Sequence, residues 1–170
     1  GNQSLYLNDA VGTGGPADII LPFGSGIPHT TGNFELTTDL YVTSSAYLNI
    51  QAEPYVTNTS LGTTGIWSLN ITMDNLGVIT IDGGTNAIVY ITSTYYLNQW
   101  FELKIDIDLT QNIWEIYIDN QLIGSFSNTS NKISSLNLYP TAGNDYYVDD
   151  ICYTYTPYTA LAYDMSAIGL

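Results

Sequence analysis

The stretch from Trp100 to Phe126 constrains the fold more than any other part of the chain, because apolar and polar residues alternate along it. Apolar residues occupy every second position from Phe101 to Leu109, with charged residues between them. This period of two is typical of an antiparallel strand that buries one face. A turn is predicted at 110–112. Two further strands are predicted after it, an alternating run from Trp114 to Asp119 and a short run from Leu122 to Phe126.

The remainder of the chain repeats this pattern in shorter runs that are separated by Gly, Pro, Asn and Asp. No segment has the 3.6-residue period of an amphipathic helix. About ten to twelve short strands with turn residues between them are typical of a sandwich or barrel. We therefore predict an all-β fold, in which two antiparallel sheets form a jelly-roll sandwich. Residues 1–156 are predicted to form one domain, and 157–170 a tail that packs on it or links it to a further domain.

Length and hydropathy agree with one globular domain. The chain has 170 residues, of which 45% are hydrophobic, so it is long enough to bury a sizeable core. No apolar run approaches the ~18 residues that a membrane-spanning helix needs, and we expect no membrane insertion. The opening residues, GNQSLYLND, do not have the pattern of a signal peptide. We interpret the chain as a mature fragment or an excised part of a larger multidomain protein.

The charge balance is strongly acidic. The chain has sixteen Asp and Glu residues but only two basic residues, Lys104 and Lys132, so its formal net charge is −14. Such a surface repels phosphate backbones, so nucleic acid is not expected as a partner. The acidic residues are scattered along the chain. Scattered acidic residues are expected of an ordinary solvated surface. They are also expected of a protein that works outside the cell, in a medium that contains calcium.

The central run also resembles a known family. The order W-F-x-L-K-I-x-I-D, a short turn, then W-x-I-Y-I-D-N-x-L-I-G-S-F is similar to the central strands of laminin-G-like (concanavalin A-like) jelly-roll domains. Asn120 stands where that family usually has glycine. The whole chain is similar to modules of large secreted Bacteroidetes proteins. The resemblance implies a jelly roll, a secreted or cell-surface location, and a glycan or another extracellular partner.

Several catalytic arrangements are disfavoured by the residues present. Family-16 glycoside hydrolases share this sandwich and carry Glu-x-Asp-x-x-Glu on one strand. The best match has Glu102, Asp106 and Asp108 but lacks the second glutamate. His29 is the only histidine and has no triad partners nearby in sequence, and Cys152 is expected to be a buried structural thiol. We expect no enzymatic activity, with a glycoside hydrolase as the less favoured alternative.

A calcium site is predicted near the end of the domain. The run from Tyr146 to Ile151 resembles the last-strand motif, hydrophobic-Asp-Asp-hydrophobic, of jelly-roll lectin domains. Its apolar positions are out of phase for a regular strand, which predicts a β-bulge at Asp149 and Asp150. A bulge exposes carbonyl and carboxylate oxygens, which are the ligands that calcium prefers. Asp9 or Asp18 is predicted to contribute from the first strand, and the calcium is expected to be structural. Alternatively, the paired aspartates cap the strand.

A glycan site is predicted from the outward positions of two segments. Alternation places Trp67, Leu69, Ile71 and Met73 on the inner face of their strand. The outward positions of 34–51 and 67–74 are then Tyr41, Tyr47, Asn49, Gln51, Ser68, Asn70 and Thr72. Aromatic rings stack on sugars, and amides bind hydroxyl groups as donors and acceptors. Tyrosine is also common on the outer faces of sheets that bind nothing.

Together these features favour a non-catalytic, secreted accessory domain that binds neutral carbohydrate through Tyr41, Tyr47, Asn49, Gln51, Asn70 and Thr72. The structural calcium is expected at Asp149, Asp150, Asp9 and Asp18. An adhesive or protein-binding module, or a purely structural one, is the alternative. Because sites are grafted repeatedly onto this fold, the fold does not choose among them.

Overall fold

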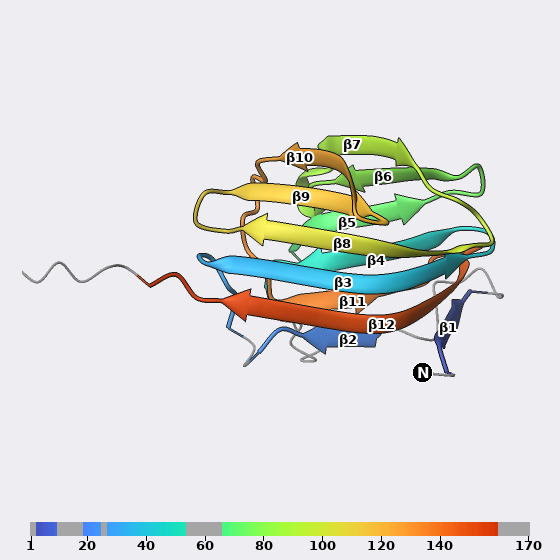
Figure 1. The fold of residues 1–170 in the computed structure, drawn as a ribbon, viewed down its shortest axis with the longest axis horizontal. Coiled ribbons are helices and arrows are strands. Elements are labelled where there is room, and N and C mark those ends of the chain that lie inside the picture. The colour runs from blue at the N-terminus through green and yellow to red at the C-terminus, as the bar shows by residue number, and fades with distance from the viewer. Residues whose placement is uncertain (1–2, 10–18, 25–26, 54–65, 160–170) are drawn as a thin grey trace, which may run out of the picture.

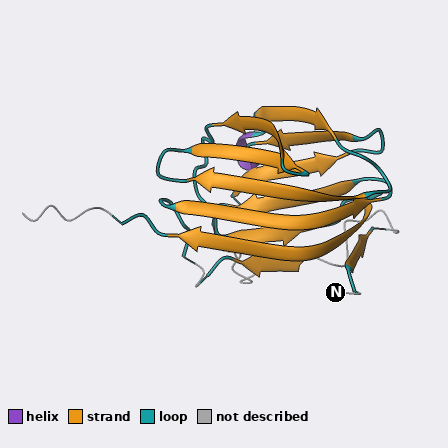
Figure 2. Ribbon diagram, in the orientation of Figure 1, coloured by secondary structure: helices purple, strands orange, loops and turns teal. Residues whose placement is uncertain are grey.

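The computed structural model describes residues 3–9, 19–24, 27–53 and 66–159, which form two six-stranded antiparallel sheets (Figure 1). Sheet A has the spatial order β1 (Leu5–Asn8), β12 (Asp145–Thr156), β3 (Asn33–Val42), β8 (Trp100–Asp108), β9 (Ile113–Ile118) and β10 (Gln121–Phe126). Sheet B has the order β2 (Ile19–Pro22), β11 (Ser135–Leu138), β4 (Ala46–Gln51), β5 (Trp67–Met73), β6 (Val78–Asp82) and β7 (Val89–Thr94). A short 3₁₀ turn, η1 (Gly84–Asn86), joins β6 to β7 (Figure 2).

The predicted jelly-roll sandwich is confirmed. Spatial neighbours within each sheet are often distant in sequence: β3 lies between β12 and β8, and β11 lies between β2 and β4. The N-terminal and C-terminal strands pair with each other, with Leu7 opposite Tyr146. Within the described residues, no helix is long and apolar enough to cross a membrane.

The core lies between the two sheets and is built by alternation. Along β3 and β8 every second side chain is buried, as the sequence predicts. The largest fully buried side chains come from both sheets and include Trp114, Tyr146, Phe23, Phe34, Leu36, Leu40, Leu48 and Met73. Burial of these side chains is the main contribution to the stability of the sandwich.

The turn between β9 and β10 explains why an asparagine can stand at position 120. Asp119 and Asn120 both have positive φ angles, 48° and 63°. Asp and Asn tolerate this left-handed region better than other residues with a side chain, so the tight return does not require glycine. Asparagine at position 120 is therefore compatible with the turn.

The bulge predicted in the last strand is confirmed. The pairing of β12 with β3 shifts register between Asp149 and Cys152, and Asp150 has a φ of 48°. After the shift, Cys152 pairs with Thr37 and its side chain is exposed. The expectation of a buried thiol is thus wrong, because the extra residue of the bulge changes the face on which Cys152 lies.

Candidate functional site

The outer face of sheet B carries a row of amide and carboxylate side chains. Asn137 of β11 pairs with Asn49 of β4, Asn49 pairs with Asn70 of β5, and Asn70 pairs with Asp82 of β6. We call these four residues the polar row. Because they are in register on neighbouring strands, they lie side by side across the sheet.

Hydrogen bonds fix the orientation of much of the polar row. The Tyr47 hydroxyl donates to Asn70 Oδ1 at 2.8 Å, and Asn49 Nδ2 lies 3.4 Å from that hydroxyl. Asn70 Nδ2 donates to Asp82 Oδ1 at 3.0 Å, which also accepts from the Gly84 N–H at 2.8 Å. The result is a preorganised set of donors and acceptors rather than a set of independently mobile side chains.

Two acceptors in the polar row have no partner. Asn49 and Asn137 are only 2% and 6% exposed, and the Oδ1 atom of each lacks a hydrogen bond. Buried side-chain acceptors are normally satisfied, and an unsatisfied one costs about 1–3 kcal/mol. Two such atoms on directly paired residues are therefore an irregularity of this face that the internal hydrogen bonds do not resolve.

Tyr47 acts as a neutral donor in this network. Burial raises the pKa of its hydroxyl above the ordinary value of 10.0, the contact with Asn49 lowers it and the Asp82 charge raises it again. The net upward direction keeps the phenol protonated at neutral pH. Its proton is committed to Asn70, and its oxygen accepts from Asn49 Nδ2.

Trp67 joins this face, contrary to the sequence prediction. Ile50 pairs with Leu69, but the next residue of β4, Gln51, pairs with Trp67, so a register shift occurs at Ser68. Trp67 consequently lies opposite an outward residue, is 36% exposed, and is not packed against the core. Strict alternation had assigned it to the inner face. The bulge is set by pairing with β4, so no local feature of the sequence reveals it.

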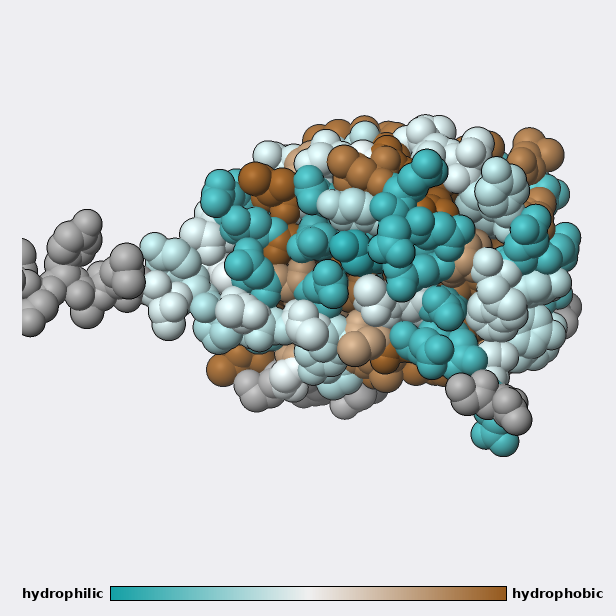
Figure 3. All heavy atoms as spheres, in the orientation of Figure 1, coloured by the Kyte–Doolittle hydropathy of each residue, from teal (hydrophilic) through white to brown (hydrophobic). Residues whose placement is uncertain are grey.

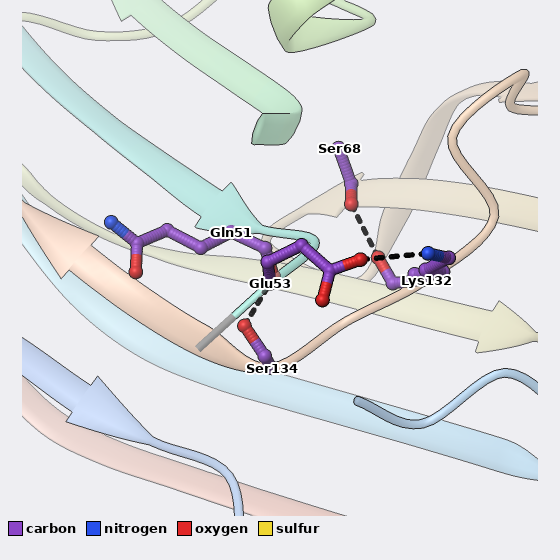
Figure 4. Close-up of polar contacts among 5 residues, drawn as sticks. All are labelled: Gln51, Glu53, Ser68, Lys132 and Ser134. Atoms are coloured by element: carbon purple, nitrogen blue, oxygen red, sulfur yellow. Dashed lines mark hydrogen bonds and ion pairs between the residues drawn. The ribbon is translucent and has the colours of Figure 1, made fainter. Parts of the chain in front are cut away.

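Gln51 is predicted to bind sugar, but much of its hydrogen bonding is internal. Its Oε1 accepts from the Ser135 hydroxyl at 2.6 Å, and its carbonyl accepts from the Ser134 hydroxyl at 3.0 Å. Nearby, the Ser68 hydroxyl donates to the Lys132 carbonyl and Lys132 forms a 2.7 Å ion pair with Glu53 (Figure 4). These contacts tie β4 and β5 to β11 and to the segment before it, and they indicate a supporting role for Gln51.

The remaining predicted sugar residues separate into two groups. Thr72 is exposed and pairs with Tyr47, so it shares the face of the polar row. Tyr41 does not. It belongs to β3 of sheet A, where it pairs with Trp100. The expectation that Tyr41 lies beside Tyr47 is wrong, because β3 and β4 are consecutive in sequence but belong to opposite sheets.

The predicted aspartate site does not form as one cluster. Asp9 lies just beyond Asn8, which pairs with Asp145, whereas Asp149 is four positions further along β12. The Asp149 carbonyl accepts from the Thr38 hydroxyl at 3.1 Å, and its Oδ1 accepts from the Asp150 N–H at 2.9 Å. Asp18 lies outside the described residues. Within the part of the chain that is described, no group of three or more His, Cys, Asp or Glu could hold a metal. The described residues thus do not bring Asp9 together with Asp149 and Asp150, and the calcium site stays a prediction.

A set of carboxylates on sheet A bears on the hydrolase alternative. Asp106 pairs with Glu35 on one side and Glu115 on the other. Burial raises the pKa of Asp106, Lys104 lowers it, and the two glutamates raise it, with a net upward shift. The Asp106 and Glu35 side chains are 42% and 45% exposed, and Lys104 lies within 4.0 Å and 3.7 Å of them. This is an open, partly neutralised surface rather than an acid and a nucleophile that face each other across a substrate cleft.

Asp39, also on sheet A, allows a test of the local electrostatics. Burial raises its pKa above 3.8, and Asp150, Asp149 and Asp119 raise it further. The folded state thus holds the proton more tightly than the unfolded state, so this carboxyl lowers stability as pH rises through and above 3.8.

Asp39→Asn is therefore expected to raise the melting temperature at pH 7. The gain is small, about 0.5 kcal/mol or ~1–2 °C, because solvent screens the group. It should vanish at about pH 3, where both states are protonated. Thermal melts at the two pH values check this. Glu53→Gln, which breaks the ion pair with Lys132, should give no gain, and a lower melting temperature for Asp39→Asn at pH 7 would contradict the argument.

No protein-family model matches the chain, and none of the curated proteins matches it in sequence. Solved structures do match in fold. Sheep galectin-11 in complex with glycerol has 11% identity and a TM-score of 0.55, over 82% of this chain and 98% of that one. The carbohydrate-binding module CBM66 from Bacillus subtilis has 14% identity and a TM-score of 0.52, over 89% and 91%. Alginate lyase AlyC3 has 8% identity and a TM-score of 0.56, over 80% and 70%. At these identities the likeness shows the fold alone: the chain is a two-sheet antiparallel jelly-roll sandwich.

Proposed function

We propose that the outer face of sheet B binds a neutral carbohydrate and that the domain is a non-catalytic accessory module. The observation that carries the proposal is the in-register polar row, in which Tyr47, Asn70 and Asp82 form one hydrogen-bonded set. Sugar hydroxyls are donors and acceptors at once, so they complement a face that offers both.

The charge of this face selects among carbohydrates. It contains the Asp82 carboxylate, and the whole chain has only two basic residues. Of these, Lys104 is on sheet A, and Lys132 is paired with Glu53. A polymer of uronic or sulfated sugars would meet repulsion without compensating cations. Hydroxyl-rich neutral glycans meet no such penalty, and the half-exposed ring of Trp67 offers a surface for stacking on a sugar.

Two fold relatives support this choice by analogy. CBM66 is a carbohydrate-binding module by its name, and galectin-11 was solved with glycerol, a small polyol. Alginate lyases share the fold equally well, so the analogy by itself does not separate binding from catalysis. The polar row and the shortage of basic residues favour a binding module. A secreted location and the origin of the module stay predictions.

Binding should be measured by calorimetric titration of soluble neutral oligosaccharides, with an alginate oligosaccharide as the acidic comparison. Asn70→Ala is expected to weaken binding of the preferred neutral glycan at least about tenfold, since it removes an amide and breaks the contacts to Tyr47 and Asp82. Asn137→Val should also weaken binding, but without loss of stability, because it removes an unsatisfied acceptor.

Glu115→Gln on sheet A is the matched control and should leave glycan affinity unchanged. Binding of the alginate oligosaccharide in preference to every neutral sugar would overturn the neutral class. If no sugar binds, or if Asn70→Ala and Glu115→Gln bind equally well, the outer face of sheet B is not a glycan site. The adhesive or purely structural reading would then be preferred.

A further inference from the structure

The outer face of sheet A carries a continuous row of aromatic side chains that the polar row does not use. Tyr6 of β1 pairs with Tyr147 of β12, Tyr147 pairs with Tyr41 of β3, and Tyr41 pairs with Trp100 of β8. Successive ring centroids are 4.7, 6.0 and 5.5 Å apart. We call these four residues the aromatic row. At ~4.8 Å between strands it extends about 14 Å across the sheet.

A row of carboxylates runs parallel to the aromatic row. Two positions along each strand, on the same face, Tyr147 is followed by Asp149 and Trp100 by Glu102, while Tyr41 is preceded by Asp39. Asp149 pairs with Asp39, and Asp39 pairs with Glu102. Three neighbouring strands therefore each present an aromatic ring and, about 7 Å away along the strand, a carboxylate. Figure 3 shows hydrophilic side chains spread over β3, β8 and β9 on this face.

We call Asp149, Asp39 and Glu102 the acidic row, and among the described residues no lysine forms an ion pair with it. The ion pairs formed by the described residues involve Lys104 with Glu35 and Asp106, and Lys132 with Glu53. The chain contains no other lysine or arginine. Like charges on directly paired residues are unfavourable, and the raised pKa of Asp39 has the nearby aspartates among its causes. The surface would thus gain from a cationic partner.

The protein already contains one filled version of this arrangement on the same face. Lys104 Nζ lies 4.3 Å from the centre of the Tyr117 ring and within 3.7 Å of the Glu35 carboxylate. A cation over a ring with a carboxylate beside it combines a cation–π contact with an ion pair. The aromatic and acidic rows repeat the ring and the carboxylate without the cation.

We propose that the aromatic and acidic rows on the outer face of sheet A form a second docking site, which binds a polypeptide segment rich in arginine and lysine. Arginine suits it best, because a guanidinium stacks on an aromatic face and also pairs with a carboxylate. The site uses none of the residues of the polar row.

The ring orientations argue against a flat polysaccharide surface as the occupant. Adjacent ring planes are inclined by 29°, 77° and 52°, whereas a flat sugar sheet needs rings that are nearly coplanar. Cationic side chains enter individually and accept varied tilts. Tyr6 and Trp100, at the two ends of the row, are 47% and 48% exposed and so accessible to them.

The test is calorimetric titration with hexa-arginine, hexalysine and, as a neutral polysaccharide fragment, cellohexaose, at low and at physiological salt. The double variant Trp100→Ala/Asp39→Asn is expected to weaken hexa-arginine binding about fivefold or more. The matched control Tyr158→Ala/Glu53→Gln also removes one exposed aromatic residue and one carboxylate, but away from the rows, and should change the affinity less than about twofold. Hexa-arginine should bind more tightly than hexalysine.

Equal weakening by the two double variants would overturn the proposal, since it would show general attraction to the net charge of −14. Binding of cellohexaose that Trp100→Ala abolishes, with no binding of hexa-arginine, would overturn it in favour of a glycan. Asn137→Val should leave hexa-arginine binding unchanged. Sugar binding by Asn137→Val therefore tests the outer face of sheet B. Peptide binding by Trp100→Ala/Asp39→Asn tests the outer face of sheet A separately.

Discussion

Replacement of Trp114 with alanine is expected to lower the free energy of unfolding by about 3–5 kcal/mol. Trp114 is fully buried, packs against Phe126 at a centroid distance of 6.1 Å, and donates its indole N–H to Asn131 Oδ1 at 3.0 Å. The substitution leaves a cavity in the sandwich and removes the donor from Asn131, whose own amide donates to the Leu109 carbonyl at 2.7 Å. The melting temperature should fall by about 10 °C or more.

Urea unfolding and thermal melts of three variants check this prediction. Trp100→Ala is the control, because Trp100 is 48% exposed, and it should cost less than about 1 kcal/mol. Trp114→Phe keeps much of the ring volume and loses the indole donor, so its effect should lie between the other two. A Trp114→Ala variant no less stable than Trp100→Ala would mean that the sandwich does not depend on this side chain.

The alternation that predicts the burial of Trp114 also predicts most of the sheet architecture. Side chains of β8 and β9 are buried at every second position, as their sequence indicates. Period-two runs fix which side chains face inward and where a strand turns back. They do not say which sheet a strand joins. Tyr41 and Tyr47 show this limit, since each was correctly assigned to an outward position, but on opposite sheets.

The candidate site was partly accessible from the sequence. Tyr47, Asn49, Asn70 and Thr72 do share one face, as predicted, because β4 and β5 are paired neighbours. Asn137 and Asp82 were missed, since they enter the row only through the pairing of β11 and β6. These pairings join residues far apart in the chain, or depend on register. Both are set by the packing of the whole sandwich rather than by local composition.

The two bulges show why one irregularity was foreseen and the other was not. In β12 the bulge leaves its mark in the sequence, because Val148 and Ile151 are out of phase with each other. In β5 the register shift occurs at Ser68, although apolar and polar residues alternate regularly in the sequence from Trp67 to Met73. The shift there is imposed by the partner strand and by the contact of the Trp67 N–H with the Thr85 hydroxyl at 2.9 Å. A bulge that preserves the pattern is invisible to periodicity.

Two residues of the polar row are not those that stability alone would favour. Asn49 and Asn137 keep buried oxygens without partners, although Val or Thr would suit these strand positions better. Residues that break a local rule in this way are typical of functional sites. The proposed glycan site therefore predicts two results for one variant: loss of Asn137 should weaken glycan binding and leave the stability of the domain equal or higher.

Replacement of Gly32 with alanine is the second substitution for which we expect a large loss, about 3 kcal/mol or more. Gly32 has a φ of +93°, and a Cβ there would lie 2.4 Å from the Thr156 carbonyl oxygen and 3.2 Å from Pro157 Cα. The left-handed backbone costs an alanine about 1–2 kcal/mol, and the overlap adds a further ~1–3 kcal/mol. Both neighbours are backbone atoms, so no change of side-chain rotamer relieves the contact.

Gly143→Ala is the matched control, since Gly143 has a φ of +84° and its Cβ would meet nothing within 4 Å. It should cost only about 1 kcal/mol, the conformational part alone. The difference between the two variants then measures how tightly the end of β12 is held against the start of β3.

Gly32 also accepts from the Leu109 N–H and donates to the Thr110 hydroxyl, both at 2.9 Å. A forced shift would therefore reach the turn after β8 as well. Faster amide exchange near Asn33 and Thr156 should accompany the loss in Gly32→Ala and be missing in Gly143→Ala. Equal destabilisation by the two substitutions would show that the end of β12 moves aside freely.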